Sequence, residues 1–451
     1  MKIVMTKDLT VGKPFTLLLR FAIPLVLGNL FQQLYNLVDA IIVGQFLGIN
    51  ALSAVGASAS VNFLILGFCI GICVGLAIPI AQKFGAKDFV MMRRFVANSY
   101  YLALAFAAAI TLTTALLCDN ILNWMKTPDV IKADAYTYQL IIFLGIPFTI
   151  LYNILASVIR ALGDSKTPFF FLVLSTMCNI LLDLICIVVL KMGVAGAGLA
   201  TIFSQGISGV ACLFYMRRKY EILRFNTGEK RIDFSVCMTL LSVGIPMGLQ
   251  TSITAIGSIM LQTAVNSLGA LEVAGYAAAL KIKGIFICPF DGIGSAVATF
   301  CGQNLGARKY ERLRQGIRSG VCIGFIWCIF TFITLQLFTE NIALLFVNTT
   351  EKEVLAFVRQ FMHTTSYFYP ALAILGSYRF AVQGVGYSKL AMLAGMLEMI
   401  ARTFMSVVMI PRFRFTAVSF TDQTAWISAA IFSTVAFYVI YNNKIKKIPI
   451  D

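Results

Sequence analysis

Long apolar runs recur along the whole 451-residue chain and limit what it can fold into. About eighteen or more apolar residues with few charges are typical of a helix that crosses a lipid bilayer. Backbone polar groups find no partners in lipid, so such runs must form helices or closed barrels. Barrel strands alternate in hydropathy at every second residue, and these runs do not. Only 12% of the residues are charged, where a soluble domain has about a quarter. The sequence predicts an all-α polytopic membrane protein.

We predict twelve transmembrane helices. The N-terminal stretch is polar and has no small-residue cleavage site, so we expect the first helix to be retained. The predicted helices lie near residues 15–43, 52–80, 94–117, 136–158, 168–190, 194–216, 237–266, 273–299, 315–338, 354–378, 389–410 and 424–441.

The net charge of +16 is a topology signal. Most lysines and arginines fall in the termini and in every second connection, including the stretch 217–231. The positive-inside rule places that stretch and both termini in the cytoplasm. We therefore expect a multi-pass protein of a prokaryotic plasma (inner) membrane, monomeric, with no nucleic-acid partner.

Signatures of enzymes and of metal centres are absent from the sequence. It contains no HExxH, GxSxG or Walker A motif, and no metal-binding spacing of cysteine and histidine. Most of the eleven cysteines lie inside apolar runs, as small buried hydrophobic residues do. We expect no enzymatic activity and no cofactor. Because the sequence has no nucleotide site, any transport across the membrane by this protein would have to use an ion gradient.

The chain contains an internal repeat at an interval of about 221 residues. Ala81–Lys87 (AQKFGAK) returns as Gly302–Arg308 (GQNLGAR), and Gly163–Lys166 (GDSK) matches Gly386–Lys389 (GYSK). An even number of helices per half makes the repeat parallel, with a pseudo-two-fold axis along the membrane normal. We predict an N-terminal six-helix lobe (1–216), a basic cytoplasmic linker (217–236), a C-terminal six-helix lobe (237–441) and a cytoplasmic tail (442–451).

One carboxylate, Asp39, lies inside the first apolar run. An aspartate there costs roughly 2.5–3.5 kcal/mol even on lenient insertion scales, so it usually marks an ion path. Tyr35 lies one turn earlier on the same helix face, and Asn179 and Asp183 share a face of the fifth helix. Counting residues from the helix ends puts Asp39, Asp183 and Thr201 at similar depth.

These oxygen atoms suit either of two coupling ions. They could hold Na⁺ between Asp39, Asn179, Asp183 and Thr201. They could equally take up a proton, because burial and a neighbouring like charge favour a protonated carboxyl. The positions matching the two acids in the second half are Met260 or Leu261 and Ser406, so the acids are not duplicated. The alternative is that they only bond neighbouring helices. The predicted cation-coupling residues are Tyr35, Asp39, Asn179, Asp183 and Thr201.

Other polar residues within helices are candidates for a substrate cavity or a charge network. Glu398 precedes Arg402 by one turn, the favourable order for a helical ion pair, and Lys283 could pair with Glu398 across helices. Packing and gating roles are both open for these charges. The cavity candidates are Gln33, Asn36, Asn153, Gln205 and Gln250, with interhelical hydrogen bonding as the alternative. The network candidates are Lys281, Lys283, Glu398 and Arg402.

Four sequence motifs together resemble the multidrug and toxic compound extrusion (MATE) family over essentially the whole chain. They are the opening IPLVLGNLFQQLYNLVDAIIVGQFLG, the paired loops AQKFGAK and GQNLGAR, the loop RALGDSKTP and the CNILLD…GVAGAGLAT run. Asp39, Asn179 and Asp183 resemble the acidic cluster of the DinF-like prokaryotic branch. The resemblance implies twelve helices in two lobes and cation-driven export of amphipathic, often cationic, small compounds.

Three alternatives to an exporter are a flippase, a membrane enzyme, and a helical scaffold or receptor. A flippase for lipid-linked oligosaccharide or lipid, from the same superfamily, would favour a cavity ringed by cations such as Arg359, Arg402, Lys281 and Lys283. A membrane enzyme would need a catalytic constellation, which the sequence lacks. A helical scaffold or receptor would not need acids within the membrane.

Overall fold

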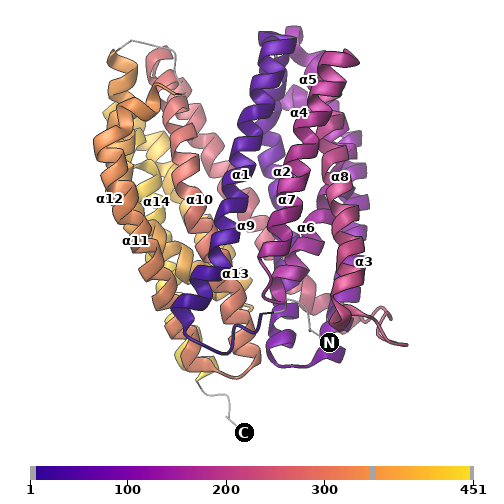
Figure 1. Cartoon of the computed structure of the whole chain (residues 1–451). Helices are drawn as coiled ribbons and strands as arrows, with labels where there is room; N and C mark the ends of the chain where they lie inside the picture. Colours follow the sequence, from indigo (N-terminus) through magenta and orange to yellow (C-terminus); the bar gives the residue numbers. More distant parts are fainter. Residues whose placement is uncertain (1–6, 346–351, 447–451) are drawn as a thin grey trace. The chain divides into compact units, whose positions relative to one another are not determined.

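The computed structural model describes residues 7–345 and 352–446, and all regular secondary structure in those ranges is helical. Figure 1 shows long helices that run side by side. The predicted fold, all-α with twelve transmembrane helices in two six-helix lobes, is confirmed. The last residues of the predicted tail (442–451) lie outside the described ranges. The first half contains α1 (Pro14–Leu47), α2 (Ile49–Gly85), α3 (Phe89–Leu116), α4 (Cys118–Trp124), α5 (Asp129–Leu144), α6 (Ile146–Ala161), α7 (Lys166–Asp183, continued by π-helical turns over Leu184–Val189) and α8 (Val194–Lys219).

The second half repeats the order of the spans, with the single helix α12 in place of the bent pair α5 and α6. A short 3₁₀ turn (Glu221–Leu223) lies in the connection between the halves. The second half contains α9 (Phe234–Asn266), α10 (Ala270–Gly306), α11 (Tyr310–Ala343), α12 (Lys352–Gly384), α13 (Ser388–Phe404, continued by π-helical turns over Met405–Met409) and α14 (Ile410–Ile440, continued over Tyr441–Ile445).

Length and composition identify the spans in the described part of the chain. Nine helices could cross a membrane, or ten if α5 and α6, bent by 44°, form one broken span. One of the nine, Ser388–Ile445, is divided where Arg414 takes a positive φ of 50°. With that division and with α12, each half has six spans.

Several predicted helix boundaries differ from the structure, and two of the differences change which side chains lie inside a helix. The fourth predicted helix (136–158) begins earlier, at Asp129, and bends at Gly145, because the ring of Pro147 just inside α6 cannot continue the preceding turn. The last predicted helix (424–441) begins soon after Arg414, so that Asp422 lies within a helix.

The described chain forms two compact units whose composition differs from the expected lobes. The first is built mainly from Leu27–Gly248, and the second from Leu9–Val26 together with the chain from Leu249 onward. Helices α1 and α9 therefore each begin in one unit and end in the other. Pro24 and Pro246 lie inside these helices, just before the change.

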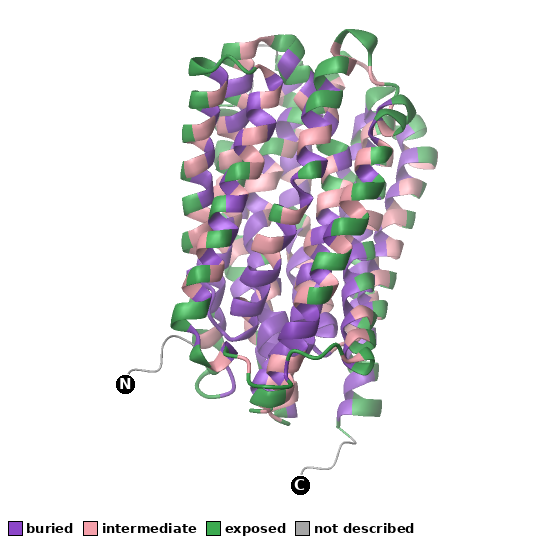
Figure 2. Ribbon diagram, turned by 90° about the vertical axis from the view of Figure 1, so that its right-hand side faces the viewer, coloured by how far each residue is buried: buried purple, intermediate pink, exposed green. Residues whose placement is uncertain are grey.

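Each unit is held together by buried apolar side chains and close helix contacts. In the first unit, a Cβ added to Gly75 of α2 would lie 2.6 Å from the Cα of Gly244 in α9. In the second unit, a Cβ on Gly292 of α10 would lie 2.7 Å from a methyl group of Val26 in α1. Small residues let helix backbones approach closely in membranes. Figure 2 shows buried residues on the inward faces of the helices and exposed ones facing outward.

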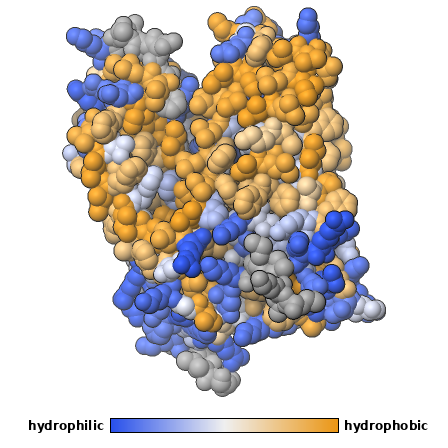
Figure 3. Space-filling model, viewed as in Figure 1, coloured by the Kyte–Doolittle hydropathy of each residue, from blue (hydrophilic) through white to orange (hydrophobic). Residues whose placement is uncertain are grey.

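Much of the outer surface is apolar, as in membrane proteins. In Figure 3, hydrophobic residues cover most of the middle of the visible face, and hydrophilic residues gather at its lower end and at parts of its upper edge. Exposed large apolar side chains include Leu104 at 69% and Ile329 at 63% exposure. A soluble monomer rarely exposes such a continuous apolar surface.

Candidate functional site

Helices α1, α7 and α8 of the first unit bring the predicted acids and their neighbours together. Asp39 is 9% exposed, Asn179 1% and Asp183 0%. The two carboxyl side chains are close enough to interact with each other. The hydroxyl oxygens of Tyr35 and Thr201 lie 3.1 Å apart and share a hydrogen bond. Helix spacing and depth, read from the sequence, therefore identified residues that meet in the structure.

The cluster contains buried polar atoms that no side chain or backbone group satisfies. Within the described residues, Oδ1 of Asp39, both carboxylate oxygens of Asp183 and both polar atoms of the Asn179 amide are buried without a hydrogen-bond partner. Native proteins leave few buried polar atoms in this state. Two ionised carboxylates are acceptors only, so they cannot satisfy each other. A proton or a metal cation between them would supply what is missing.

The surroundings of the acids are apolar except for one further side chain. Tyr138 of α5 is 6% exposed and lies within electrostatic range of both Asp39 and Asp183. It packs in an apolar cluster with Ile142 and Ile187. Sequence reasoning missed Tyr138 because the predicted helix began at residue 136, which placed this side chain at a membrane surface. The earlier start at Asp129 puts it more than two turns inside the helix.

The helix that carries Asp183 changes its winding directly after that residue. Its turns over Leu184–Val189 are π-helical. Turns of this type occur frequently at functional sites. The corresponding helix of the second unit, α13, is followed by the same winding over Met405–Met409, where the matching residue is Ser406. The backbone feature is thus repeated, but the carboxylate is not.

The cavity candidates fall into two groups. Asn36 is exposed on α1 and Gln33 is half-buried there. Asn153 and Gln205 are half-buried and joined through Thr149, whose hydroxyl donates to Gln205 Oε1 at 2.6 Å and whose carbonyl oxygen accepts from Asn153 at 2.8 Å.

Gln250, the remaining cavity candidate, is 8% exposed, and its Oε1 accepts a 2.6 Å hydrogen bond from Gln383 Nε2. The structure thus uses it to join α9 and α12 in the second unit. That is the interhelical hydrogen bonding stated above as the alternative.

In the second unit, five side chains form a chain of alternating charge with a buried centre and half-buried ends, here called the charge chain (Lys283, Asp422, Arg402, Glu398 and Arg379). Lys283 Nζ donates to Asp422 at 2.5 Å, and Arg402 Nε donates to the other oxygen of Asp422 at 2.9 Å. Arg402 also lies 3.6 Å from Glu398, which accepts a 2.6 Å hydrogen bond from Arg379. The chain joins α10, α14, α13 and α12.

The charge chain differs from the predicted network in three respects. Lys283 does not pair with Glu398, because α14 places Asp422 against it. Asp422 and Arg379 were missed, the former because the last helix was expected to begin at residue 424. Lys281 is exposed and takes no part in the chain. The Glu398–Arg402 contact one turn apart is formed as predicted.

Each carboxylate of the charge chain contacts two cations. Asp422 lies between Lys283 and Arg402, and Glu398 between Arg402 and Arg379. The carboxylates of the charge chain thus have cationic partners, in contrast to those of the acid pair in the first unit.

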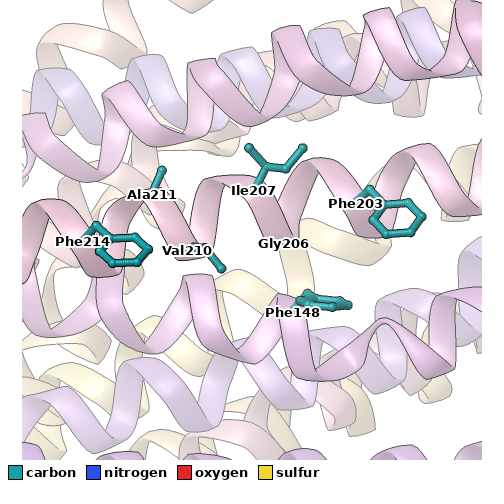
Figure 4. A pocket seen from close by; sticks show the side chains of 7 residues that line it. All are labelled: Phe148, Phe203, Gly206, Ile207, Val210, Ala211 and Phe214. Atoms are coloured by element: carbon teal, nitrogen blue, oxygen red, sulfur yellow. The ribbon is translucent and has the colours of Figure 1, made fainter.

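An apolar groove lies on the surface between α6 and α8 (Figure 4). No polar side chain lines it, so it has no means of holding a coupling ion. Phe203 and Phe214 are 52% and 58% exposed there, as expected of residues in contact with lipid acyl chains. The groove is lined by Phe148, Phe203, Gly206, Ile207, Val210, Ala211 and Phe214.

A repeated bundle of membrane helices is an architecture found in many membrane transporters. The model of the MatE family matches the chain twice, over residues 24–185 and 246–408. The chain therefore belongs to the MatE family. The two matches also reproduce the internal repeat.

Several known proteins are similar to this chain. The probable multidrug resistance protein YpnP of Bacillus subtilis (strain 168) is 29% identical over 386 residues, which cover 86% of this chain and 85% of YpnP. The probable multidrug resistance protein NorM of Thermotoga maritima is 25% identical over 374 residues, 82% of this chain and 80% of NorM.

A solved structure shows the same fold. The MOP superfamily transporter from Pyrococcus furiosus is 23% identical, with a TM-score of 0.92 over 99% of this chain and 100% of that one. In that protein, the reverse polarity of the binding pocket suggests a different function.

Proposed function

We propose that the protein is a cation-coupled antiporter that exports amphipathic, often cationic, small organic compounds, with H⁺ or Na⁺ bound between Asp39 and Asp183. The observation that carries this proposal is the set of buried, unpartnered polar atoms on Asp39, Asn179 and Asp183. Relatives named as multidrug resistance proteins support the choice of cargo.

The acid pair could hold either ion through its own side chains. A proton on one carboxyl would let that group donate a hydrogen bond to the other, which removes the repulsion between two buried like charges. Sodium would instead be bound by the carboxylate oxygens, the amide oxygen of Asn179 and the hydroxyl of Thr201. A cation that moves inward gains about 2.3 kcal/mol per 100 mV of membrane potential, which can drive export.

The charge chain favours the antiporter over the flippase. A flippase would use free cations to hold phosphate groups, but Lys283, Arg379 and Arg402 are each bound to a carboxylate. Arg359, at a helix end, contacts Glu340 at 3.1 Å. Of the cations suggested for a flippase cavity, Lys281 alone has no ion-pair partner among the described residues.

The proposed membrane and the orientation of the chain in it rest on the distribution of lysine and arginine. The excess of lysine and arginine in alternate connections supports a plasma-membrane protein of a prokaryote with both termini in the cytoplasm. The proposed partners are the lipid bilayer and the exported compounds. We propose that the protein works as a monomer and without a cofactor, enzymatic chemistry or nucleic acid.

Efflux in membrane vesicles tests the proposal. A fluorescent organic cation is loaded, and Na⁺ and pH gradients are imposed separately on wild type, Asp39→Asn and Asp183→Asn. We expect one of the two gradients to drive efflux by the wild type and each substitution to abolish that gradient-driven component. Asp119→Asn, which alters an exposed carboxylate outside the cluster, should behave as wild type. Full gradient-driven efflux by both cluster variants would refute ion coupling at this site.

A further inference from the structure

One face of α10 in the second unit has an unusual composition. Side chains spaced three and four residues apart share a helix face. On this face, Ala274, Ala277, Lys281 and Asp291 are exposed, and the small residues Gly284 and Cys288 occupy the turns between the two charges. We call Ala274, Ala277, Lys281, Gly284, Cys288 and Asp291 the α10 stripe.

The α10 stripe differs from a lipid-facing surface. The exposed residues of the neighbouring α11 are large and apolar, for example Ile326, Ile329 and Ile333, all more than half exposed. The α10 stripe has no large apolar side chain and contains two charged ones. Charged side chains within membrane spans nearly always face a water-filled cavity or the bundle interior. The exposed members of the α10 stripe, which include both charges, therefore face water, whereas Gly284 is half-buried and Cys288 is buried.

Lys281 and Asp291 are unpaired charges. Neither makes a hydrogen bond or an ion pair with any described residue. Lys283, only two positions from Lys281, points to the other side of α10 and is bound to Asp422. Ten residues separate Lys281 from Asp291, which is roughly 15 Å along a helix. Asp291 also lies within electrostatic range of Arg379. Arg379 itself forms an ion pair with Glu398.

The internal repeat provides a comparison. An offset of 221 residues places Ser60 of α2 opposite Lys281 and Ile70 opposite Asp291. The first unit thus has no charge at either place, and the second unit has no counterpart of Asp39 and Asp183. The two charges of the α10 stripe are an addition specific to the second unit. Packing of the repeat does not require them.

From this we infer that Lys281 and Asp291 form a two-point binding site for amphoteric cargo, in which Lys281 binds a carboxylate and Asp291 a basic nitrogen. The site takes compounds whose acidic and basic groups are separated by up to roughly 15 Å. This inference rests on the proposed export function and specifies its substrate class. The cations of the charge chain each contact a carboxylate of that chain: Lys283 and Arg402 contact Asp422, and Arg379 contacts Glu398.

Equilibrium binding of two matched dyes to the purified protein in detergent tests the inference without a gradient. The probes are a rhodamine ethyl ester, a permanent cation, and the corresponding free acid, a zwitterion. We expect the wild type to bind the free acid about fivefold more tightly than the ester, since one partly screened ion pair contributes up to about that much. Lys281→Gln should remove this preference and leave the affinity for the ester unchanged.

Two further variants complete the test. Asp291→Asn should weaken binding of both dyes about fivefold, because both carry the cationic group. Lys219→Gln, which removes an exposed lysine at the end of α8, should match the wild type. An acid preference that persists in Lys281→Gln, or that is absent from the wild type, overturns the two-point site and leaves ion-coupled export standing. Binding of neither dye by the wild type overturns the proposed cargo class as well.

Discussion

Three buried aspartates of the first unit differ in how their oxygens are satisfied. Asp164 accepts hydrogen bonds from the hydroxyls of Tyr220 and Thr167, at 2.5 and 2.7 Å, and from two backbone N–H groups. It has all the partners that a structural carboxylate needs. Asp39 and Asp183 lie among apolar side chains with oxygen atoms left unpartnered. This difference in partners, rather than burial, distinguishes the coupling candidates from a structural acid.

A prediction about a single residue concerns Glu229, which lies in the connection between the halves. Both of its oxygens accept 2.7 Å hydrogen bonds from the Arg93 guanidinium, and the backbone N–H of Asn226 also donates to it. The guanidinium lowers the pKa of Glu229 from 4.5 to about 2. A carboxyl whose pKa falls on folding stabilises the fold above its ordinary pKa, and loses that contribution as the pH drops through the folded value.

The difference in Tm between wild type and Glu229→Gln should therefore be largest above about pH 4.5 and should vanish as the pH falls towards about 2. Thermal unfolding in detergent measures it. Glu221→Gln, at an exposed carboxyl of the same connection, controls for general effects of charge. A Tm difference that does not change with pH would contradict the assigned ion pair.

At the scale of elements, the contact between α2 and α9 depends on glycine. A Cβ on Gly75 would lie 2.6 Å from the backbone of Gly244, where neither helix has a side chain that could move aside. Gly75→Ala should therefore separate the helices and destabilise the first unit by about 1–3 kcal/mol. Thermal unfolding in detergent is the measurement.

Gly56 of the same helix is the matched control. A Cβ there would meet nothing within 4 Å. Gly56→Ala should be neutral, or stabilising by up to about 1 kcal/mol, because alanine favours the helix. Equal loss of stability in both variants would show that the close helix contact is not what requires Gly75.

A second prediction about contacts between helices concerns the charge chain. Arg402 is the central cation between Asp422 and Glu398. Arg402→Met should destabilise the second unit by about 3–5 kcal/mol, because it leaves two buried carboxylates with one cation each. Arg359→Met, which breaks an exposed pair, should cost less than about 1 kcal/mol. Similar Tm values for the two variants would show that the buried chain contributes little to stability.

At the scale of the whole molecule, the two units repeat the same scaffold of helices but differ in their charged side chains. Both units have the same order of helices, and both have π-helical turns after the matching helices α7 and α13. The unsatisfied acids occur in the first unit, and the charge chain and the charged α10 stripe in the second. This asymmetry is the basis of our proposals that the first unit binds the driving ion and the second unit binds the cargo.

Reporter fusions test the predicted orientation of the whole chain in the membrane. Green fluorescent protein fused after the last residue should fluoresce, because it folds in the cytoplasm. Alkaline phosphatase fused after Lys191 should be active, because the connection between α7 and α8 is predicted to lie outside. Reversed results from the two fusions would refute the orientation derived from the positive charges.

The sequence alone was sufficient to predict the fold class, the repeat and most members of the acid cluster. Hydropathy predicts spans because the cost of placing a residue in hydrocarbon depends mainly on that residue. Helical spacing and depth then sufficed to select Tyr35, Asp39, Asn179, Asp183 and Thr201, because positions along one helix follow from 1.5 Å per residue. The motifs also identified the family.

Only the tertiary structure decided which side chains meet across helices. The partners of Lys283 and Glu398 turned out to be Asp422 and Arg379, and Tyr138 joined the acid pair. The bend at Gly145 likewise had not been predicted. These features depend on the rotation and register of each helix against its neighbours. Close packing at positions such as Gly75 sets that register, and no pattern within one helix records it.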